Sequence, residues 1–155
     1  MILEVEESER LQLKRYRMDI FERSKEIQEA KMLSPLVWAY VGDSVYELFI
    51  RTHLVNYSNA KPHKLHLETI QFVKAEAQAK ILDRIWDKLS KEEQEIFKRG
   101  RNTENHHLPK NGNVADYSHA TGFEALIGYL YLTKQDERLE EILKLCIMEE
   151  GGFYG

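Results

Sequence analysis

Two stretches of the chain carry apolar side chains almost without interruption, and each has the length of a helix. They run from Ser34 to Phe49 and from Tyr117 to Thr133. Serine followed by proline is a favourable helix start, because serine caps the first turn and proline lacks an N–H that this turn would leave unpaired. Apolar positions all round a helix are typical of a protein core. We therefore expect the first stretch to be the central helix of the fold, ending near Val55.

The rest of the chain shows amphipathic helical patterns separated by polar breaks. The sequence contains no alternating strand pattern, so we predict an all-α fold, a helical bundle. The other predicted elements are a charged N-terminal helix from Glu7 to about Ala30, a short helix opened by Pro62, a longer one from about Leu67 to Leu89, a helix with a Ser90–Glu93 capping box that Gly100 would end, a loop from Arg101 to Asp116, and a last helix from Asp136 to Glu149.

The length of 155 residues suits one domain with its own core. We divide the chain into an N-terminal helical extension over residues 1–32 and a main domain over residues 33–150. The extension would pack on the main domain or on a partner. The alternative is a partly frayed, charged arm.

Charge and composition narrow the class of protein. A formal net charge of −4 argues against a nucleic-acid binder that is basic all over, but it allows a local basic patch. The single Cys146 excludes an internal disulfide and a cysteine-based zinc site, and it suits a reducing cytosol. The N-terminus lacks a signal-peptide core, and the longest apolar run is too short to span a bilayer. We expect a cytoplasmic protein with no membrane partner.

One acidic residue interrupts each of the two apolar helices. Asp43 lies in the first and Glu124 in the second, where small neighbours such as Gly128 would let another helix approach closely. Two buried carboxylates repel each other unless one is protonated or a cation lies between them. Oxygen ligands without cysteine suit Mg²⁺, with Mn²⁺ as a substitute. The alternative is that each acid hydrogen-bonds a buried backbone or tyrosine group.

Several motifs resemble the ribonuclease III family. Tyr40–Glu47 (YVGDSVYE) resembles its signature helix, Ala120–Gly128 (ATGFEALIG) its second acidic helix, and Phe72–Ala79 a helix between them. Lys98–Asn102, followed by Pro109–Asn111, is similar to Mini-ribonuclease III, the small bacterial branch with a catalytic domain and no separate double-stranded-RNA-binding domain. The resemblance covers roughly residues 33–145 and leaves the N-terminal arm outside.

The chain departs from the full-length members of this family within the acidic site. Those members usually carry glutamates where this chain has Leu36 and Ala39, and an aspartate where it has Thr121. Asp43 and Glu124 alone match their set of about four carboxylates, and Mini-type members share this thinned site. Glu47 would contribute through a water or, more simply, make a buried hydrogen bond.

The resemblance implies a Mg²⁺-dependent endoribonuclease that cleaves double-stranded or structured RNA and leaves 5′-phosphate and 3′-hydroxyl ends. Asp43 and Glu124 would be both the catalytic residues and the metal ligands. A homodimer would supply one site for each RNA strand, with its interface on the two acidic helices. The precursor of large-subunit (23S) ribosomal RNA is the substrate that the resemblance suggests. The predicted RNA-binding residues lie in the best local basic cluster: Lys98, Arg99, Arg101, Asn102 and Lys110.

Other interpretations of these residues stay open. The basic cluster could be a solvated helix end and loop. The same fold could act as a non-catalytic, dimeric RNA- or ribosome-binding module, although both acids are retained. A Mg²⁺-dependent phosphohydrolase of small substrates is a third possibility, which the basic loop and the absence of a glycine-rich nucleotide motif disfavour. No motif joins the adjacent His106 and His107 to other histidines, so we expect loop or surface roles for them.

Overall fold

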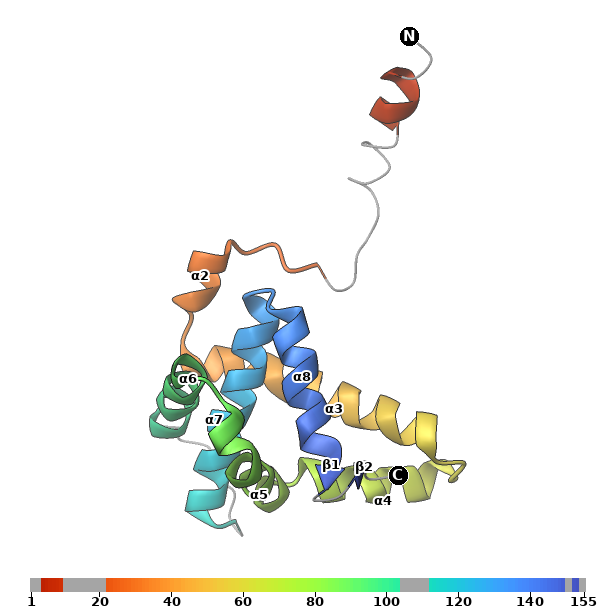
Figure 1. Cartoon of the computed structure of the whole chain (residues 1–155), viewed down its shortest axis with the longest axis vertical. Helices are drawn as coiled ribbons and strands as arrows, with labels where there is room; N and C mark the ends of the chain where they lie inside the picture. Colours follow the sequence, from red (N-terminus) through yellow and green to blue (C-terminus); the bar gives the residue numbers. More distant parts are fainter. Residues whose placement is uncertain (1–3, 10–21, 104–111, 150–151, 154–155) are drawn as a thin grey trace.

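Helix α7 (Val114–Leu132) forms the centre of an all-α fold (Figure 1). The computed structural model describes residues 4–9, 22–103, 112–149 and 152–153. Residues 4–9 are helical. The labelled elements are α2 (Ile27–Lys31), α3 (Pro35–Tyr57), α4 (Pro62–Val73), α5 (Ala75–Ile85), the 3₁₀ turn η1 (Trp86–Lys88), α6 (Lys91–Asn102), α7, α8 (Asp136–Ile147), and the two-residue strands β1 (Met148–Glu149) and β2 (Gly152–Phe153).

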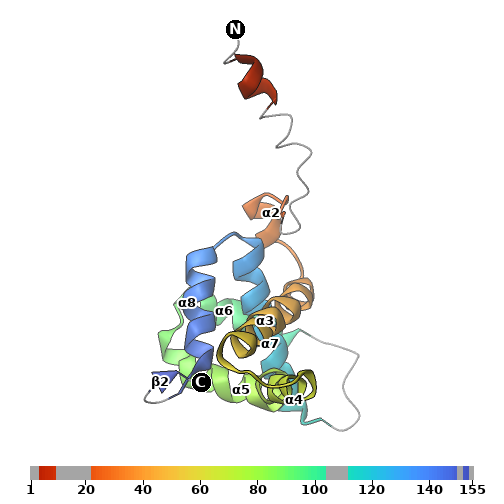
Figure 2. The ribbon, with the colours of Figure 1, turned by 90° about the vertical axis from the view of Figure 1, so that its right-hand side faces the viewer.

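The most buried helix is α7 rather than α3. Every residue from Ala120 to Leu130 except Glu124 is buried, and α7 contacts α2, α3, α5, α6 and α8. Figures 1 and 2 both show α8 lying beside the second half of α7. Our expectation that α3 is the central helix was wrong, because the described part of the chain covers one side of α3 and leaves the other to solvent. The exposed apolar residues of α3 are Val37, Tyr40, Leu48, Val55 and Tyr57.

The start of α3 agrees with the sequence prediction. The Ser34 hydroxyl accepts a hydrogen bond from the backbone N–H of Leu36, and Pro35 occupies the first helical position. The helix ends at Tyr57, two residues beyond the expected end. Local capping chemistry therefore determines where this helix begins.

Helices α3 and α7 cross with their backbones in contact. A Cβ atom at Gly42 would overlap the backbone oxygen of Glu124, and one at Gly128 would overlap the backbone oxygen of Trp38. The prediction that small residues let the two acidic helices approach closely is confirmed. No residue larger than glycine fits at either position without separating the helices.

Glycine has the same role between α6 and α7, which corrects a second expectation. Gly100 does not end α6; the helix continues to Asn102. A Cβ atom at Gly100 would lie 2.6 Å from the Cβ of Ala125, and one at Gly122 would lie 2.6 Å from the Phe97 ring. The Ser90–Glu93 capping box at the start of α6 is present, as predicted.

The break between α4 and α5 lies at Lys74, whereas the sequence predicted it near Leu67. Lys74 has an extended backbone and caps both helices. The residue is neither proline nor glycine, so nothing local marks the break. The buried Gln78 amide donates to the Val73 carbonyl, which the break leaves without a helical partner. A side-chain hydrogen bond from a residue five positions further along the chain thus accompanies a break that helix propensity does not predict.

The predicted continuous helix from Glu7 to Ala30 is also wrong, because residues 22–26 are not helical. Arg23 instead binds the turn between α7 and α8. Its guanidinium donates to the Tyr131 carbonyl at 2.9 Å and to both carboxylate oxygens of Asp136 at 2.5 and 2.9 Å. The buried Ala30 carbonyl accepts the indole N–H of Trp38 at 2.9 Å. The last part of the extension is therefore attached to the main domain.

The loop after α6 and the C-terminal end differ in detail from the sequence prediction. Residues 103–113 connect α6 to α7, so the connection is shorter than expected at both ends. The last helix ends at Ile147, and β1 pairs with β2 in a short antiparallel hairpin that no sequence pattern indicated. None of the described helices is long and apolar enough to cross a membrane.

The helix crossing generates a prediction about stability. Gly128→Ala should lower the free energy of unfolding by about 2 kcal/mol or more, because the added Cβ overlaps backbone atoms that cannot move independently. Alanine for glycine in an unobstructed helix would instead stabilise the protein by up to about 1 kcal/mol. Chemical denaturation measures the change, with Ser44→Ala on the exposed face of α3 as the control. An unchanged or raised stability of the Gly128 variant would contradict the close crossing.

Candidate active site

The two predicted carboxylates line the same pocket. Asp43 follows Gly42 on α3, and Glu124 lies one turn before Gly128 on α7, so the glycine crossing brings both acids to one place. The pocket has a volume of about 270 Å³. Its lining residues are Leu36, Ala39, Tyr40, Asp43, Ser44, Tyr117, Thr121 and Glu124.

Asp43 is exposed in this chain, which corrects the expectation of a carboxylate buried in an apolar core. It lies at the border of the α3 face that nothing in the described chain covers. Partial desolvation of the carboxyl group nevertheless raises its pKa, and the charge of Glu47 one turn later raises the pKa further.

Glu124 is the more perturbed of the two acids. Burial raises the pKa of its carboxyl from 4.5 to about 7, and the nearby charge of Asp43 adds to this effect. A hydrogen bond from Gln78 acts in the opposite direction, because it favours the charged form. At neutral pH the Glu124 carboxyl is therefore poised between its two protonation states.

Gln78 on α5 is a site residue that the sequence prediction missed. Its amide nitrogen donates to Glu124 Oε1 at 3.1 Å and to the Val73 carbonyl at 2.8 Å. The sequence predicted one helix from about Leu67 to Leu89 across Lys74, so the start and the buried face of α5 were not identified. The buried positions of α5 are Gln78, Ala79, Leu82 and Ile85. A glutamine four and seven residues before two buried apolar residues is the signal that could have identified it.

The acidic pair fits a hard divalent cation. Magnesium is commonly bound through one or two carboxylates together with substrate phosphates and water, rather than by a full cage of protein ligands. Asp43 and Glu124 supply two carboxylates on adjacent helices, and their raised pKa values indicate a site that favours added positive charge. The described residues contain no cluster of three or more histidine, cysteine, aspartate or glutamate side chains that could hold a metal ion.

Glu47 does not make the buried hydrogen bond that we expected. Its carboxylate is half exposed and forms an ion pair with Arg51 at 3.7 Å, one turn further along α3. Its charge raises the pKa of Asp43.

Four of the five predicted RNA-binding residues lie on the last turns of α6, and Lys110 lies outside the described residues. The Arg99 guanidinium lies 4.9 Å from the centre of the Trp38 ring on α3, and Arg101 lies 5.6 Å from the Phe97 ring. Lys98 pairs with Glu95 at 3.3 Å. Arg101 Nε donates to Asn102 Oδ1 at 3.0 Å. The basic end of α6 is thus held against the core by stacked arginines, with Arg99 and Asn102 exposed.

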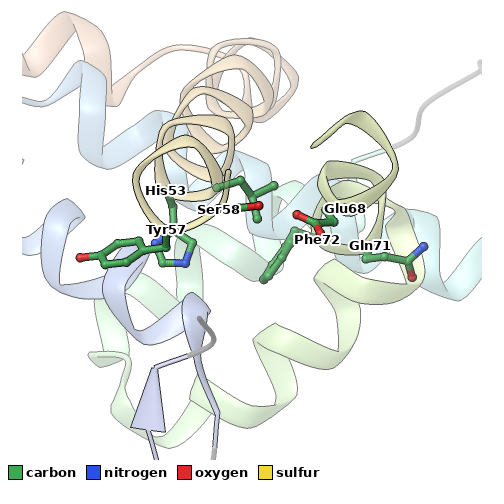
Figure 3. A pocket seen from close by; sticks show the side chains of 7 residues that line it. His53, Tyr57, Ser58, Glu68, Gln71 and Phe72 are labelled. Carbon is green, nitrogen blue, oxygen red and sulfur yellow. The ribbon is translucent and has the colours of Figure 1, made fainter. Parts of the chain in front are cut away.

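A second pocket, of about 310 Å³, lies between the end of α3 and α4 (Figure 3). His53 and Tyr57 line it from α3, and Glu68, Gln71 and Phe72 line it from α4. The buried His53 ring lies 4.9 Å from the Tyr57 ring. No sequence pattern singled out His53, and neither acid of the first pocket lines this one.

Comparisons with known proteins agree with the fold. The family described as "Ribonuclease III domain" matches residues 36–135. The chain is 53% identical to Mini-ribonuclease 3 of Clostridium tetani over 121 residues, which is 77% of this chain and 80% of that protein. It is 44% identical to Mini-ribonuclease 3 of Enterococcus faecalis over 81% of this chain and 96% of that protein. A crystal structure of a Fusobacterium nucleatum protein, 31% identical, matches with a TM-score of 0.65 over 72% of this chain and 89% of its own.

The raised pKa of Glu124 generates a prediction about the metal-free protein. A carboxyl whose pKa rises on folding binds protons more tightly in the native state, so its contribution to stability is lost as pH rises from about 4.5 to about 7. Glu124→Gln removes the ionisable carboxyl and therefore this loss of stability at high pH. The variant should therefore be more stable than the parent at pH 8, by up to roughly 3 kcal/mol, and similar to it near pH 4.5. Thermal unfolding across this pH range measures the difference, and a difference independent of pH would contradict the assigned shift.

Proposed function

The chain belongs to the ribonuclease III family, and we propose that it is a double-strand-specific endoribonuclease whose catalytic residues are Asp43 and Glu124. The observation that carries this proposal is the pairing of the two acids in one pocket at the crossing of α3 and α7. Residues 33–150 would form the catalytic domain, and residues 1–32 its N-terminal extension.

The family is metal-dependent, and Asp43 and Glu124 would hold Mg²⁺ in this chain, with Mn²⁺ as a substitute. When bound there, the cation would stabilise the charge that develops on the phosphate oxygens and lower the pKa of the attacking water. Glu124 must lose its proton to act as a ligand, and the Gln78 hydrogen bond favours that charged form. Asp43 is exposed, so an RNA phosphate can reach it from solvent.

The walls of the pocket support a site with fewer carboxylates than the resemblance implies for full-length relatives. Leu36, Ala39 and Thr121 line it at positions where the sequence resemblance implies acids in full-length relatives. Ala39 is buried, and the Thr121 hydroxyl donates to the Tyr117 carbonyl. These side chains shape the pocket without adding charge, so two carboxylates would carry the whole interaction with the cation.

The basic end of α6 would contact RNA phosphates through Lys98, Arg99, Arg101 and Asn102, together with Lys110. Double-stranded RNA is recognised mainly by its shape and by contacts to phosphates and 2′-hydroxyl groups. The contact of Arg99 with the Trp38 ring supports this role, because it holds the positively charged guanidinium in one position next to α3. The affinity for RNA should then fall steeply as the salt concentration rises.

A second copy of the chain would cover the exposed face of α3. Val37, Tyr40, Leu48 and Val55 recur along this helix, and Tyr40 also lines the acidic pocket. An apolar face of this length is unusual on a surface that stays in water. A homodimer through this face would bury it and place two acidic sites on one assembly, one for each strand of a duplex. The precursor of large-subunit ribosomal RNA is the substrate we propose.

Asp43→Asn should abolish cleavage of duplex RNA, because it removes one of two charged ligands while keeping the shape of the side chain. We expect a loss of about 4 kcal/mol of transition-state stabilisation, or roughly a thousandfold in rate. A labelled duplex incubated with and without Mg²⁺ measures the rate. The variant should still bind the duplex, with an affinity that depends steeply on salt. Cleavage at the parent rate would refute the assignment of Asp43, and binding insensitive to salt would refute the phosphate contacts.

Leu48→Lys should convert the protein to a monomer, because it places a charge in the centre of the proposed interface. Leu48 is 55% exposed in the single chain, so the substitution should leave the fold intact. Light scattering after size-exclusion chromatography measures the mass. Leu67→Lys is the matched control, since Leu67 is a leucine of similar exposure (48%) on α4. A parent protein that is monomeric, or a Leu48 variant that remains dimeric, would exclude this face as the interface.

A further inference from the structure

We propose that Gln78 is a positioning residue for Glu124, which it holds in one orientation for cation binding. This inference rests on the proposed function, in which Glu124 is a metal ligand. It adds a third helix, α5, to a site that otherwise comes from α3 and α7.

The hydrogen bonds of Gln78 fix the orientation of its amide. The side chain is 1% exposed, and its Nε2 lies 2.8 Å from the Val73 carbonyl oxygen and 3.1 Å from Glu124 Oε1. Both neighbours are acceptors when Glu124 is charged. The amide must therefore present its NH₂ group to them, since a flipped amide would place oxygen against oxygen.

This orientation leaves the other end of the amide unsatisfied. Gln78 Oε1 is buried and has no hydrogen-bond partner within the described chain. A buried polar atom without a partner destabilises a fold, and an apolar side chain would avoid that cost. Leu82 and Ile85, on the same face of α5, show that the surroundings accept apolar residues. A glutamine that costs stability at such a position indicates a role in the neighbouring site.

The hydrogen bond from Gln78 restricts the rotation of the Glu124 carboxylate. Among the described residues, Gln78 supplies the only hydrogen bond to that group. One oxygen is held by the amide, so the carboxylate cannot rotate freely and Oε2 stays available to a ligand. Partners that orient a metal-binding side chain in this way commonly change metal affinity by about 10- to 100-fold when they are removed.

A purely structural role for Gln78 is the competing explanation. Its bond to Val73 satisfies a carbonyl at the break between α4 and α5, and a cap of this kind needs no contact with Glu124. The two explanations differ in what they predict for metal binding. A cap would affect the stability of the protein alone, whereas a positioning residue would affect the affinity of the site for a cation.

The test replaces Gln78 by methionine, which has a similar length and no amide. Titration with Mn²⁺, followed by the electron paramagnetic resonance signal of the free ion, measures the affinity without RNA and without cleavage. We expect Gln78→Met to weaken Mn²⁺ binding about tenfold or more. The Mg²⁺ concentration for half-maximal cleavage should rise by a similar factor, with a smaller change in the rate at saturating Mg²⁺. Thr69→Val is the matched control, because Thr69 is buried on α4 and donates to the Leu65 carbonyl away from the acids.

A second measurement uses the parent protein and does not depend on the folding of a variant. The Gln78 side-chain NH₂ resonances in a ¹⁵N-labelled sample should exchange slowly with water and shift when Mg²⁺ is added. Unshifted resonances, or a folded Gln78→Met protein with the parent's Mn²⁺ affinity, would overturn the inference. If the Glu124→Gln variant bound Mn²⁺ as tightly as the parent protein, that result would instead overturn the proposed metal site itself.

Discussion

The site depends on the contact between two backbones at Gly42 and Gly128. Helices normally approach each other no closer than their side chains allow. Removing the side chain at one position on each helix lets α3 and α7 touch, and this sets the distance between the residues next to the contact. Asp43 follows one glycine directly, and Glu124 precedes the other by one turn. The acidic pair is therefore a consequence of how the helices pack.

Two aromatic pairs hold this crossing on either side of the glycines. Trp38 packs edge-to-face on Tyr129, with ring centres 5.0 Å apart, and Tyr46 packs in the same way on Phe123, also at 5.0 Å. Such pairs contribute about 0.5–1.5 kcal/mol each beyond the area they bury. They can offset the repulsion and desolvation that raise the pKa of both acids. These apolar contacts thus keep the two carboxylates close together, although their desolvation and electrostatic repulsion oppose this arrangement.

The sequence predicted those features that depend on local chemistry. The Ser34 cap and the Ser90–Glu93 capping box are both present. The close approach of the two acidic helices was also predicted, from their small residues. The sequence prediction failed where packing that no local signal marks decides the structure. Gly100 resembles a helix end but serves as a point of close approach to α7. Lys74 carries no signal for a break, and the Val73 carbonyl that the break frees is bound by Gln78 on the following helix. The same error concealed Gln78, whose position relative to the core depends on where the break lies.

The error about Asp43 has a different physical origin. Apolar residues surround it in sequence, yet the part of the chain that the structure describes leaves one face of α3 exposed. Apolar residues occupy every face of a helix that is buried, whether its own chain or another molecule covers that face. The apolar pattern of α3 therefore indicates more burial than the described residues of one chain supply. The difference lies on one side of the helix and borders the acidic pocket, and this is the arrangement expected if the face is covered in an assembly whose active sites lie beside its interface.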